Sequence, residues 1–135
     1  MENFSAARPA EKLVLIVDDD KDIRDLLAVI ISKEGFRVAQ AQDGEDAQAK
    51  ARALLPDLVL LDLMLPKSSG FETLHELQTD ETAKIPIIVM TGRQLDPSTC
   101  EMIKREGNVR DFIGKPIKTE ELIAQLHKLL KTRAA

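Results

Sequence analysis

Apolar residues follow two alternating patterns along the chain: short unbroken runs, and stripes spaced as on one face of a helix. Short runs rich in β-branched side chains are typical of strands buried on both faces of a parallel sheet. The predicted strands are 13–17, 36–41, 58–61, 86–90 and 111–114. The second of these runs is less hydrophobic than the others, so we expect it at or near an edge of the sheet.

Stripes at helical spacing separate these runs and predict helices. The stripes are Ile23, Leu26, Leu27, Ile30 and Ile31; Ala47, Ala51, Leu54 and Leu55; Phe71, Leu74 and Leu77; a thin face with Met102 and Ile103; and Leu122, Ile123, Leu126, Leu129 and Leu130. Gly35 and Pro56 end the first two helices. Asp43-Gly44 marks a turn, and Thr119 caps the last helix. Five strands alternating with five helices predict an α/β fold with a doubly wound parallel sheet, because right-handed crossovers place helices on both faces.

The composition is that of one soluble globular domain, with 135 residues of which 44% are hydrophobic and 31% charged. A net charge of -4 and an isoelectric point near 5.2 argue against direct binding of nucleic acid. Cys100 is the only cysteine, so no internal disulfide can form and a reducing compartment is favoured. The sequence has neither a signal-peptide core nor an apolar run of membrane-spanning length, so we expect a cytoplasmic protein with no membrane contact.

Three consecutive aspartates, Asp18, Asp19 and Asp20, close the first apolar run. Carboxylates are costly to bury unless they are paired or bind a cation. Ligands of open α/β sheets bind just beyond the carboxyl ends of the strands, so the cluster suggests a divalent-cation site. The alternative is a helix N-cap, in which Asp20 or Asp19 accepts hydrogen bonds from the first amides of the next helix. An N-cap accounts for one aspartate and leaves the others unexplained.

Polar residues also end the later strands. Asp62 follows the third strand, Thr91 the fourth and Lys115 the fifth. Taken singly, Asp62 could cap a turn, Thr91 could be a helix N-cap and Lys115 could be a solvated loop residue. Because parallel strands share one carboxyl edge, however, all of them converge with the aspartates of the first strand. Together they would hold a hard cation, a nucleophile and a developing phosphoryl charge in one place.

The sequence resembles the receiver domains of two-component response regulators. The motifs that carry the resemblance are Ile16-Val17-Asp18-Asp19, Leu61-Asp62 with Met64, Pro66 and Gly70, Met90-Thr91-Gly92, and Lys115-Pro116. The resemblance covers residues 12–131, which leaves 1–11 as a flexible lead-in and 132–135 as a C-terminal tail. It implies a flavodoxin-like sheet with the strand order 2-1-3-4-5.

The resemblance implies that Asp62 is the phospho-acceptor. It would take its phosphoryl group from a phosphohistidine of a sensor histidine kinase or of a phosphotransfer protein. By the same resemblance, Asp19, Asp62 and the backbone carbonyl of Met64 bind Mg²⁺, with Asp18 assisting. We therefore expect a signalling protein rather than an enzyme, with only self-phosphorylation and self-dephosphorylation chemistry.

The resemblance also assigns the residues around the phosphoryl group. Thr91 would hydrogen-bond the acyl phosphate, Lys115 would pair with a phosphoryl oxygen, and Gly92 would leave room and a free amide. New charge on Asp62 would attract Thr91 and reorder the fourth helix. We expect the face formed by the fourth helix, fifth strand and fifth helix to switch the binding of a downstream protein target or a fused effector domain. Phe112 stands at the aromatic switch position and lacks the hydroxyl of the tyrosine often found there.

Departures from the family pattern concentrate between Thr91 and Lys115, where residues 106–110 replace the common small-residue turn. Two other interpretations stay open. A receiver-like interaction module would bind its partner regardless of phosphorylation. A phosphatase of the haloacid dehalogenase type would use Asp18 as its nucleophile, although Asp22 stands where Thr or Val is expected and the chain is short for a cap and core. Met64, with Arg93, is expected to flank the approach of a hydrolytic water.

Overall fold

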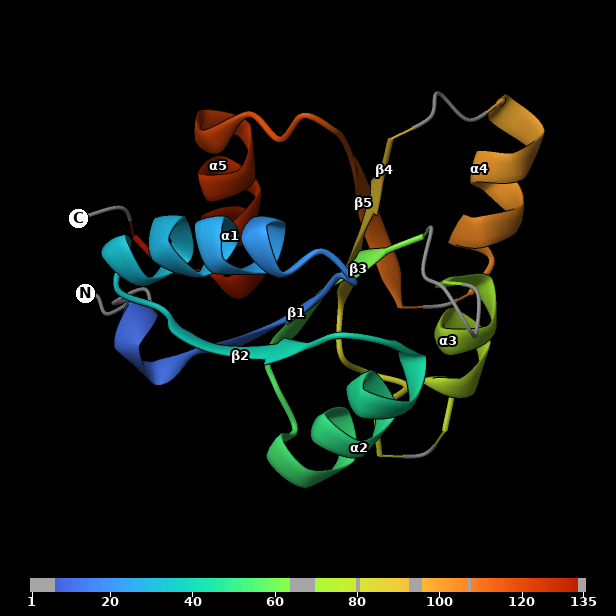
Figure 1. Cartoon of the computed structure of the whole chain (residues 1–135), viewed down its shortest axis with the longest axis horizontal. Coiled ribbons are helices and arrows are strands. Elements are labelled where there is room, and N and C mark those ends of the chain that lie inside the picture. The colour runs from blue at the N-terminus through green and yellow to red at the C-terminus, as the bar shows by residue number, and fades with distance from the viewer. Residues whose placement is uncertain (1–6, 64–69, 80, 93–95, 107, 134–135) are drawn as a thin grey trace, which may run out of the picture.

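The computed structural model describes residues 7–63, 70–79, 81–92, 96–106 and 108–133, and Figure 1 shows the arrangement of its elements. One five-stranded parallel sheet has the order β2-β1-β3-β4-β5. Its strands are β1 (Leu13–Val17), β2 (Arg37–Ala41), β3 (Leu58–Asp62), β4 (Ile87–Thr91) and β5 (Val109–Gly114). The predicted doubly wound sheet, its strand order and the edge position of β2 are confirmed.

In the part of the chain that the structure describes, five α-helices cover the sheet, and a 3-10 helix, η1 (Pro9–Glu11), precedes β1. The helices are α1 (Lys21–Lys33), α2 (Gly44–Leu54), α3 (Gly70–Glu76), α4 (Pro97–Lys104) and α5 (Thr119–Leu130). Helices α1 and α5 pack on one face of the sheet, and α2, α3 and α4 on the other (Figure 1). This is the layering that right-handed crossovers between parallel strands produce.

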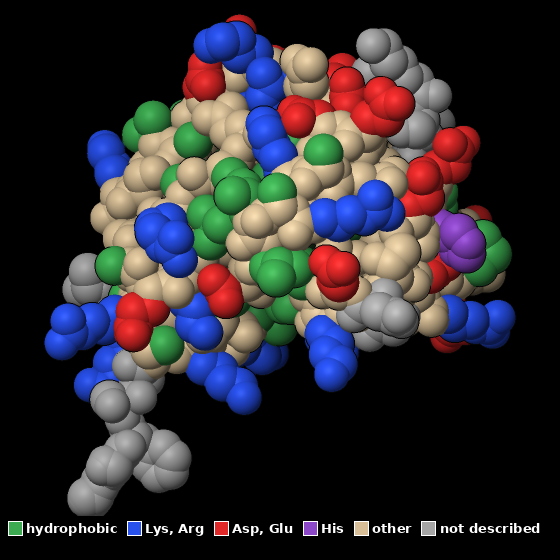
Figure 2. Space-filling view, turned by 90° about the horizontal axis from the view of Figure 1, so that it is seen from below, with side chains coloured by type: hydrophobic (Ala, Val, Ile, Leu, Met, Phe, Trp, Pro, Cys, Tyr) green, Lys and Arg blue, Asp and Glu red, His purple; other side chains and the backbone are tan. Residues whose placement is uncertain are grey.

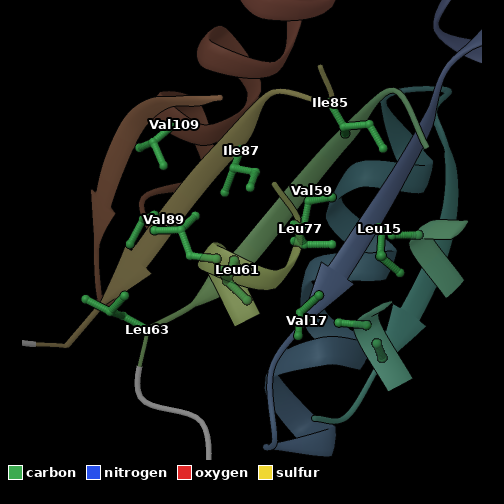
Figure 3. Packing of buried hydrophobic residues seen from close by; sticks show 14 of the residues in the cluster. Leu15, Val17, Val59, Leu61, Leu63, Leu77, Ile85, Ile87, Val89 and Val109 are labelled. Carbon is green, nitrogen blue, oxygen red and sulfur yellow. The ribbon is translucent and has the colours of Figure 1, made fainter. Parts of the chain in front are cut away.

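Alternate residues of each strand feed two separate apolar clusters. On β1, Leu15 and Val17 belong to the cluster under α2, α3 and α4, whereas Val14 and Ile16 belong to the cluster under α1 and α5. Figure 3 shows the first cluster, to which β1, β3, β4 and β5 contribute side chains together with Leu77, which follows α3. All four β1 residues are fully buried, and burying a side chain of this size contributes about 1.5–3 kcal/mol to stability.

The first helix has the predicted ends. Asp20 is its N-cap and accepts hydrogen bonds from the amides of Asp22 and Ile23 at 2.9 and 3.4 Å. Gly35 follows the helix with a φ of 103°, a conformation in which a side chain would be strained. The sequence analysis therefore placed the C-terminal end correctly, and of its two N-cap candidates, Asp20 and Asp19, the structure selects Asp20.

The predicted turn at Asp43-Gly44 lies where α2 begins. The chain bends at Asp43, which is the N-cap of α2 and accepts from the Asp46 amide at 2.8 Å. The N-cap of α5 is Lys118, whose side chain makes no capping bond, and Thr119 is already helical. The prediction that Thr119 caps α5 was therefore wrong by one position, since a hydroxyl beside a helix does not by itself fix which residue leaves the helical conformation.

Several residues of the predicted apolar stripes are exposed. Leu26 of α1, Leu54 and Leu55 at the end of α2, Phe71 of α3 and Met102 of α4 are 41–60% accessible to solvent. A helix on a flat sheet contacts it along a narrower arc than the apolar stripe covers, so the flank of the stripe faces water. Figure 2, seen from the side of α2, shows hydrophobic side chains grouped near the middle of the surface with charged ones around them.

The described part of the expected lead-in lies against the domain rather than extending away from it. The Ala7 amide donates to the Lys131 carbonyl at 3.0 Å, and Ala7 forms a parallel bridge with Thr132. Beneath this bridge, His127 contacts the Thr132 hydroxyl at 2.6 Å and a Glu34 carboxylate oxygen at 2.8 Å. Within the described ranges, no helix has the length and apolar character needed to cross a membrane.

Candidate functional site

The candidate site lies at the carboxyl edge of the sheet, where the strand register brings distant residues together. Val17 pairs with Leu61, so the residues that follow each, Asp18 and Asp62, lie side by side. On the other flank, β4 and β5 end level with each other. The predicted convergence of polar strand ends is therefore present.

Asp18 is the most deeply buried of the site residues, with no exposed surface. Its backbone amide donates to the Ala41 carbonyl at 3.2 Å, which ties the end of β1 to the end of β2. One carboxylate oxygen accepts from the Asp20 amide at 3.0 Å, and the other accepts from the Lys115 Nζ at 2.8 Å. The side chain is thus held in a single orientation, facing the cluster.

Asp18, Asp19 and Asp62 offer carboxylate oxygens that all lie within 4.8 Å of one another. Asp18 and Asp62 are buried and Asp19 is exposed, so the group opens to solvent on one side. Oxygen ligands of this kind suit a hard divalent cation such as Mg²⁺, which keeps several waters and takes one or two carboxylates. The donor set fits the predicted ion. Asp20 caps α1, as one interpretation of the aspartate run expected, and Asp18 and Asp19 belong to the carboxylate cluster, at which cation binding stays a prediction.

Lys115 bridges the two buried carboxylates. Its Nζ donates to Asp18 at 2.8 Å and to Asp62 at 3.1 Å. Burial works to lower the pKa of Lys115, but its hydrogen bonds and its attraction to Asp18 and Asp62 together outweigh burial and raise that pKa above its ordinary value. The lysine is therefore fixed in its charged form, and it is not the solvated loop residue that was the alternative. A cis peptide bond joins it to Pro116.

Thr91 is the last residue of β4 and is buried. Its carbonyl accepts the Lys115 amide at 2.9 Å, so the backbones of the two residues are joined directly. Thr91 is not a helix N-cap, since Asp96 caps α4 and accepts from the Thr99 amide at 2.7 Å. Gly92 is exposed, and among the described residues a Cβ placed there would meet no atom within 4 Å other than those of its chain neighbours, which the comparison leaves out.

Gly70 fixes the backbone on which Asp62 stands. Its amide donates to the Leu63 carbonyl at 3.1 Å. A Cβ at this position would lie 2.5 Å from the Leu63 Cα and 2.7 Å from the Asp62 carbonyl oxygen, which is too close for any side chain. A glycine is required here because the start of α3 crosses directly over the end of β3.

Phe112 lies on β5, half-buried against the cluster under α2, α3 and α4. The Nζ of Lys104, on α4, lies 5.6 Å from the centre of its ring, a cation–π arrangement. The predicted switch residue thus contacts the helix that the prediction names. Two other predicted residues, Met64 and Arg93, lie outside the described part of the chain.

One residue near the site was missed by the sequence analysis. Arg24 of α1 donates from Nη1 to the carbonyl of Asp18 at 2.8 Å. A signal for it existed, because Arg24 lies three positions before Leu27 and seven before Ile31, on the buried side of the helix. A charged residue at such a position needs a polar partner.

The family model described as "Response regulator receiver domain" matches residues 14–127. The chain belongs to this family. Receiver domains generally act in signalling, and phosphorylation by a kinase is the standard behaviour of the family. Membership contradicts the haloacid dehalogenase interpretation, in which Asp18 would be the nucleophile.

Curated relatives are regulators of two-component systems. The DNA-binding dual master transcriptional regulator RpaA of Synechocystis sp. is 40% identical over 87% of this chain and 48% of its own length. The phosphate regulon transcriptional regulatory protein PhoB of Pseudomonas aeruginosa is 37% identical over 89% of this chain and 52% of its own length. The DNA-binding response regulator MtrA of Mycobacterium tuberculosis is 36% identical over 87% of this chain and 50% of its length. The receiver domain spans about half the length of these relatives.

Solved structures show the same fold. Chemotaxis protein CheY4 of Vibrio cholerae superposes with a TM-score of 0.81 at 28% identity, covering 87% of this chain and 98% of CheY4. The N-terminal domain of a response regulator receiver protein from Methanoculleus marisnigri gives 0.73 at 32% identity, covering 90% and 98%. The flavodoxin-like receiver fold that the motifs implied is confirmed.

We expect Gly70→Ala to destabilise the domain by about 1–3 kcal/mol, because the new methyl group must push the Leu63 and Asp62 backbone aside. Urea unfolding followed by circular dichroism measures the loss. Gly114→Ala is the matched control, since a Cβ there meets no atom within 4 Å. Equal stability of the two variants would contradict the close approach at Gly70.

We expect Lys115→Met to destabilise the metal-free domain by about 1–3 kcal/mol at pH 7, less than for a fully buried pair, because 22% of the lysine side chain is exposed. The pKa of Lys115 is higher in the folded state than in the unfolded state, so its contribution is complete below pH 10.5. That contribution is lost as the pH rises through the folded-state pKa. The stability difference between wild type and variant, measured by urea unfolding from pH 7 to 12, should therefore shrink at the alkaline end. A difference that does not change with pH would show that the ion pairs contribute nothing.

Proposed function

We propose that this receiver domain accepts a phosphoryl group on Asp62 from the phosphohistidine of a sensor histidine kinase or phosphotransfer protein, in a Mg²⁺-dependent reaction. The observation that carries the proposal is the position of Asp62. Its carboxylate lies within reach of two further carboxylates and accepts a hydrogen bond from Lys115. The Asp62 carboxylate would thus have both a bound cation and the positive charge of Lys115 within reach.

Asp18, Asp19 and Asp62 would hold the Mg²⁺, and the Met64 carbonyl, outside the described residues, is the expected backbone ligand. When bound, the ion would neutralise phosphoryl charge and orient the oxygens in line. The exposure of Asp19 supports this assignment, because an ion that keeps part of its water shell needs an open side.

The other site residues act by position and charge. Phosphoryl transfer has a loose transition state with charge spread over the equatorial oxygens, so binding groups around it contribute more than covalent chemistry does. Lys115 is held charged by its two carboxylates and can turn to a phosphoryl oxygen once Asp62 is modified. Thr91, whose carbonyl accepts the Lys115 amide, and Gly92, which is exposed, would supply a hydroxyl and an amide.

We propose that phosphorylation changes partner binding at the face formed by α4, β5 and α5. The backbone of Thr91 is bonded to that of Lys115, and the Phe112 ring lies under Lys104 of α4. Movement of Thr91 toward a phosphoryl group would therefore act on the α4 side of β5. The partner that reads this face would be a downstream protein target or an effector domain fused to the receiver.

The names of the curated relatives suggest what kind of effector such a receiver domain can be joined to. RpaA and MtrA are named as DNA-binding, and this chain spans about half of each. We propose that DNA binding, where it occurs, belongs to an effector and not to this acidic domain, whose net charge is -4. The setting of the proposed phosphorelay is the cytoplasm.

The proposed function is tested by incubating the domain with acetyl phosphate and Mg²⁺ and measuring its mass. Wild type should gain a phosphoryl group, and Asp62→Asn should not, because its amide is not a nucleophile. Asp19→Ala should lose Mg²⁺ binding and phosphorylation while keeping its circular dichroism spectrum, because a ligand is removed without disturbing the core. Asp22→Asn, on the exposed side of α1, is the control and should behave as wild type.

Either of two outcomes would refute the assignment. Near-normal phosphorylation of Asp62→Asn would place the acceptor elsewhere. A wild-type protein that binds Mg²⁺ but takes no phosphoryl group from acetyl phosphate or from a kinase would favour the interaction module that works regardless of phosphorylation.

We expect the ring resonances of Phe112 to shift when beryllofluoride and Mg²⁺ occupy the site. A ring that moves into the space left by Thr91 gains on the order of 1–3 kcal/mol by burial, enough to change a two-state equilibrium by tenfold or more. Phenylalanine-labelled protein and NMR measure this, since the chain has no Trp or Tyr for fluorescence. Phe36 is the internal control, because its ring packs on the opposite face of the sheet. Unchanged Phe112 signals at an occupied Asp62 would show that the ring is fixed core.

A further inference from the structure

Arg24 joins the candidate metal site to two other parts of the fold. It stands in the first turn of α1, where its backbone amide donates to the Asp20 carbonyl at 3.0 Å. Its guanidinium reaches back over the turn, and Nη1 donates to the Asp18 carbonyl at 2.8 Å. On its other edge, Nε donates to the side-chain oxygen of Gln40, on β2, at 3.2 Å. One side chain therefore binds the end of β1 to α1 and to β2.

The contact is directly relevant to the aspartate cluster. The Asp18 carbonyl belongs to the peptide that links Asp18 to Asp19, the two carboxylates contributed by the turn after β1. The Asp18 side chain stabilises the turn, because its carboxylate accepts a hydrogen bond from the Asp20 amide. Arg24 stabilises the backbone of the same turn through its hydrogen bond to the Asp18 carbonyl. Freeing this peptide would let both carboxylates change their separation from Asp62.

We propose that Arg24 is a positioning residue for the Mg²⁺ site, which it serves by fixing the Asp18–Asp19 peptide. The inference rests on the proposed function of that site. Arg24 reaches the site through a backbone carbonyl, and no contact joins its guanidinium to a carboxylate of the cluster among the described residues. Partners that orient metal ligands in this indirect way typically change metal affinity by 10–100-fold when removed.

If Arg24 acts by holding the Asp18–Asp19 peptide in position, its removal should weaken Mg²⁺ binding. If it acts only through its charge, its removal should strengthen Mg²⁺ binding, so the two possibilities can be told apart. A guanidinium near a cation site repels the cation, so if Arg24 acted only through its charge, Arg24→Ala would bind Mg²⁺ more tightly. If it acts by position, Arg24→Ala should bind Mg²⁺ at least tenfold more weakly. Amide chemical shifts during a Mg²⁺ titration give the dissociation constant without any phosphorylation step. Lys33→Ala, at the exposed far end of the same helix, removes the same charge and should leave affinity within twofold of wild type.

Arg24→Lys separates the two effects further. It keeps the charge, but a single ammonium nitrogen cannot occupy the places of both Nη1 and Nε. If Arg24 acts by position, the Mg²⁺ affinity of Arg24→Lys should lie between those of wild type and Arg24→Ala. If Arg24 acts only through its charge, the Mg²⁺ affinity of Arg24→Lys should equal that of wild type. This variant also serves as the folded test case if Arg24→Ala does not fold.

A measurement without metal completes the test. In metal-free protein, the Asp20 amide should exchange its hydrogen faster in Arg24→Ala than in wild type or Lys33→Ala, because the turn that holds it is loosened. Asp19→Ala tests the proposed site itself: wild-type affinity in that variant would refute the site. Wild-type affinity and exchange in both Arg24 variants, alongside a loss of binding in Asp19→Ala, would overturn only the inference about Arg24.

Discussion

The constraint on which the rest of the site depends is the balance of charge at the carboxyl edge of the sheet. Asp18 and Asp62 are buried side by side, and two carboxylates in a poorly solvated place repel each other. Lys115 offsets this repulsion with hydrogen bonds of 2.8 and 3.1 Å. The position of Lys115 is set by the hydrogen bond from its backbone amide to the Thr91 carbonyl. The positive charge that offsets the two carboxylates is therefore held in place by the neighbouring strand, β4. The residue that stabilises the acidic cluster is thus also the residue next to the proposed output.

A cluster of this kind needs a rigid support, which the two apolar layers supply. Each central strand is packed on both faces, and its buried residues alternate between the cluster under α1 and α5 and the cluster under α2, α3 and α4. Because neither face can shift without opening a cavity, the strand ends keep their register. The loops beyond them can then carry charge and close contacts such as the crossing at Gly70.

The region where the sequence departs from the family pattern is also where the sheet is irregular. The register of β4 with β5 shifts between Ile87 and Ile88. Ile87 pairs with Val109 and Ile88 with Asp111, so Arg110 has no partner in this register. Asn108, just before β5, is buried and donates to the Ile85 carbonyl at 3.0 Å. Its side-chain oxygen also accepts from Gln78. The unusual turn is therefore anchored by polar contacts in place of small residues, and β5 can still deliver Lys115 to the site.

The sequence by itself determined the order of elements, the α/β class and which polar residues follow the strands at their carboxyl ends, because these depend on local signals: unbroken apolar runs, helical stripes and charges at strand ends. It also placed Gly35 and narrowed the N-cap of α1 to Asp19 or Asp20, since these residues act on their own helix. Only the tertiary structure decided what depends on contact between distant segments. Leu26 and Met102 sit in apolar stripes yet face water, because the area that a helix buries is set by the surface beneath it. The partners of Arg24 were decided in the same way: its position on the buried side of α1 indicated that it needs a polar partner, but the Asp18 carbonyl and Gln40 meet it only when β1, β2 and α1 have packed together.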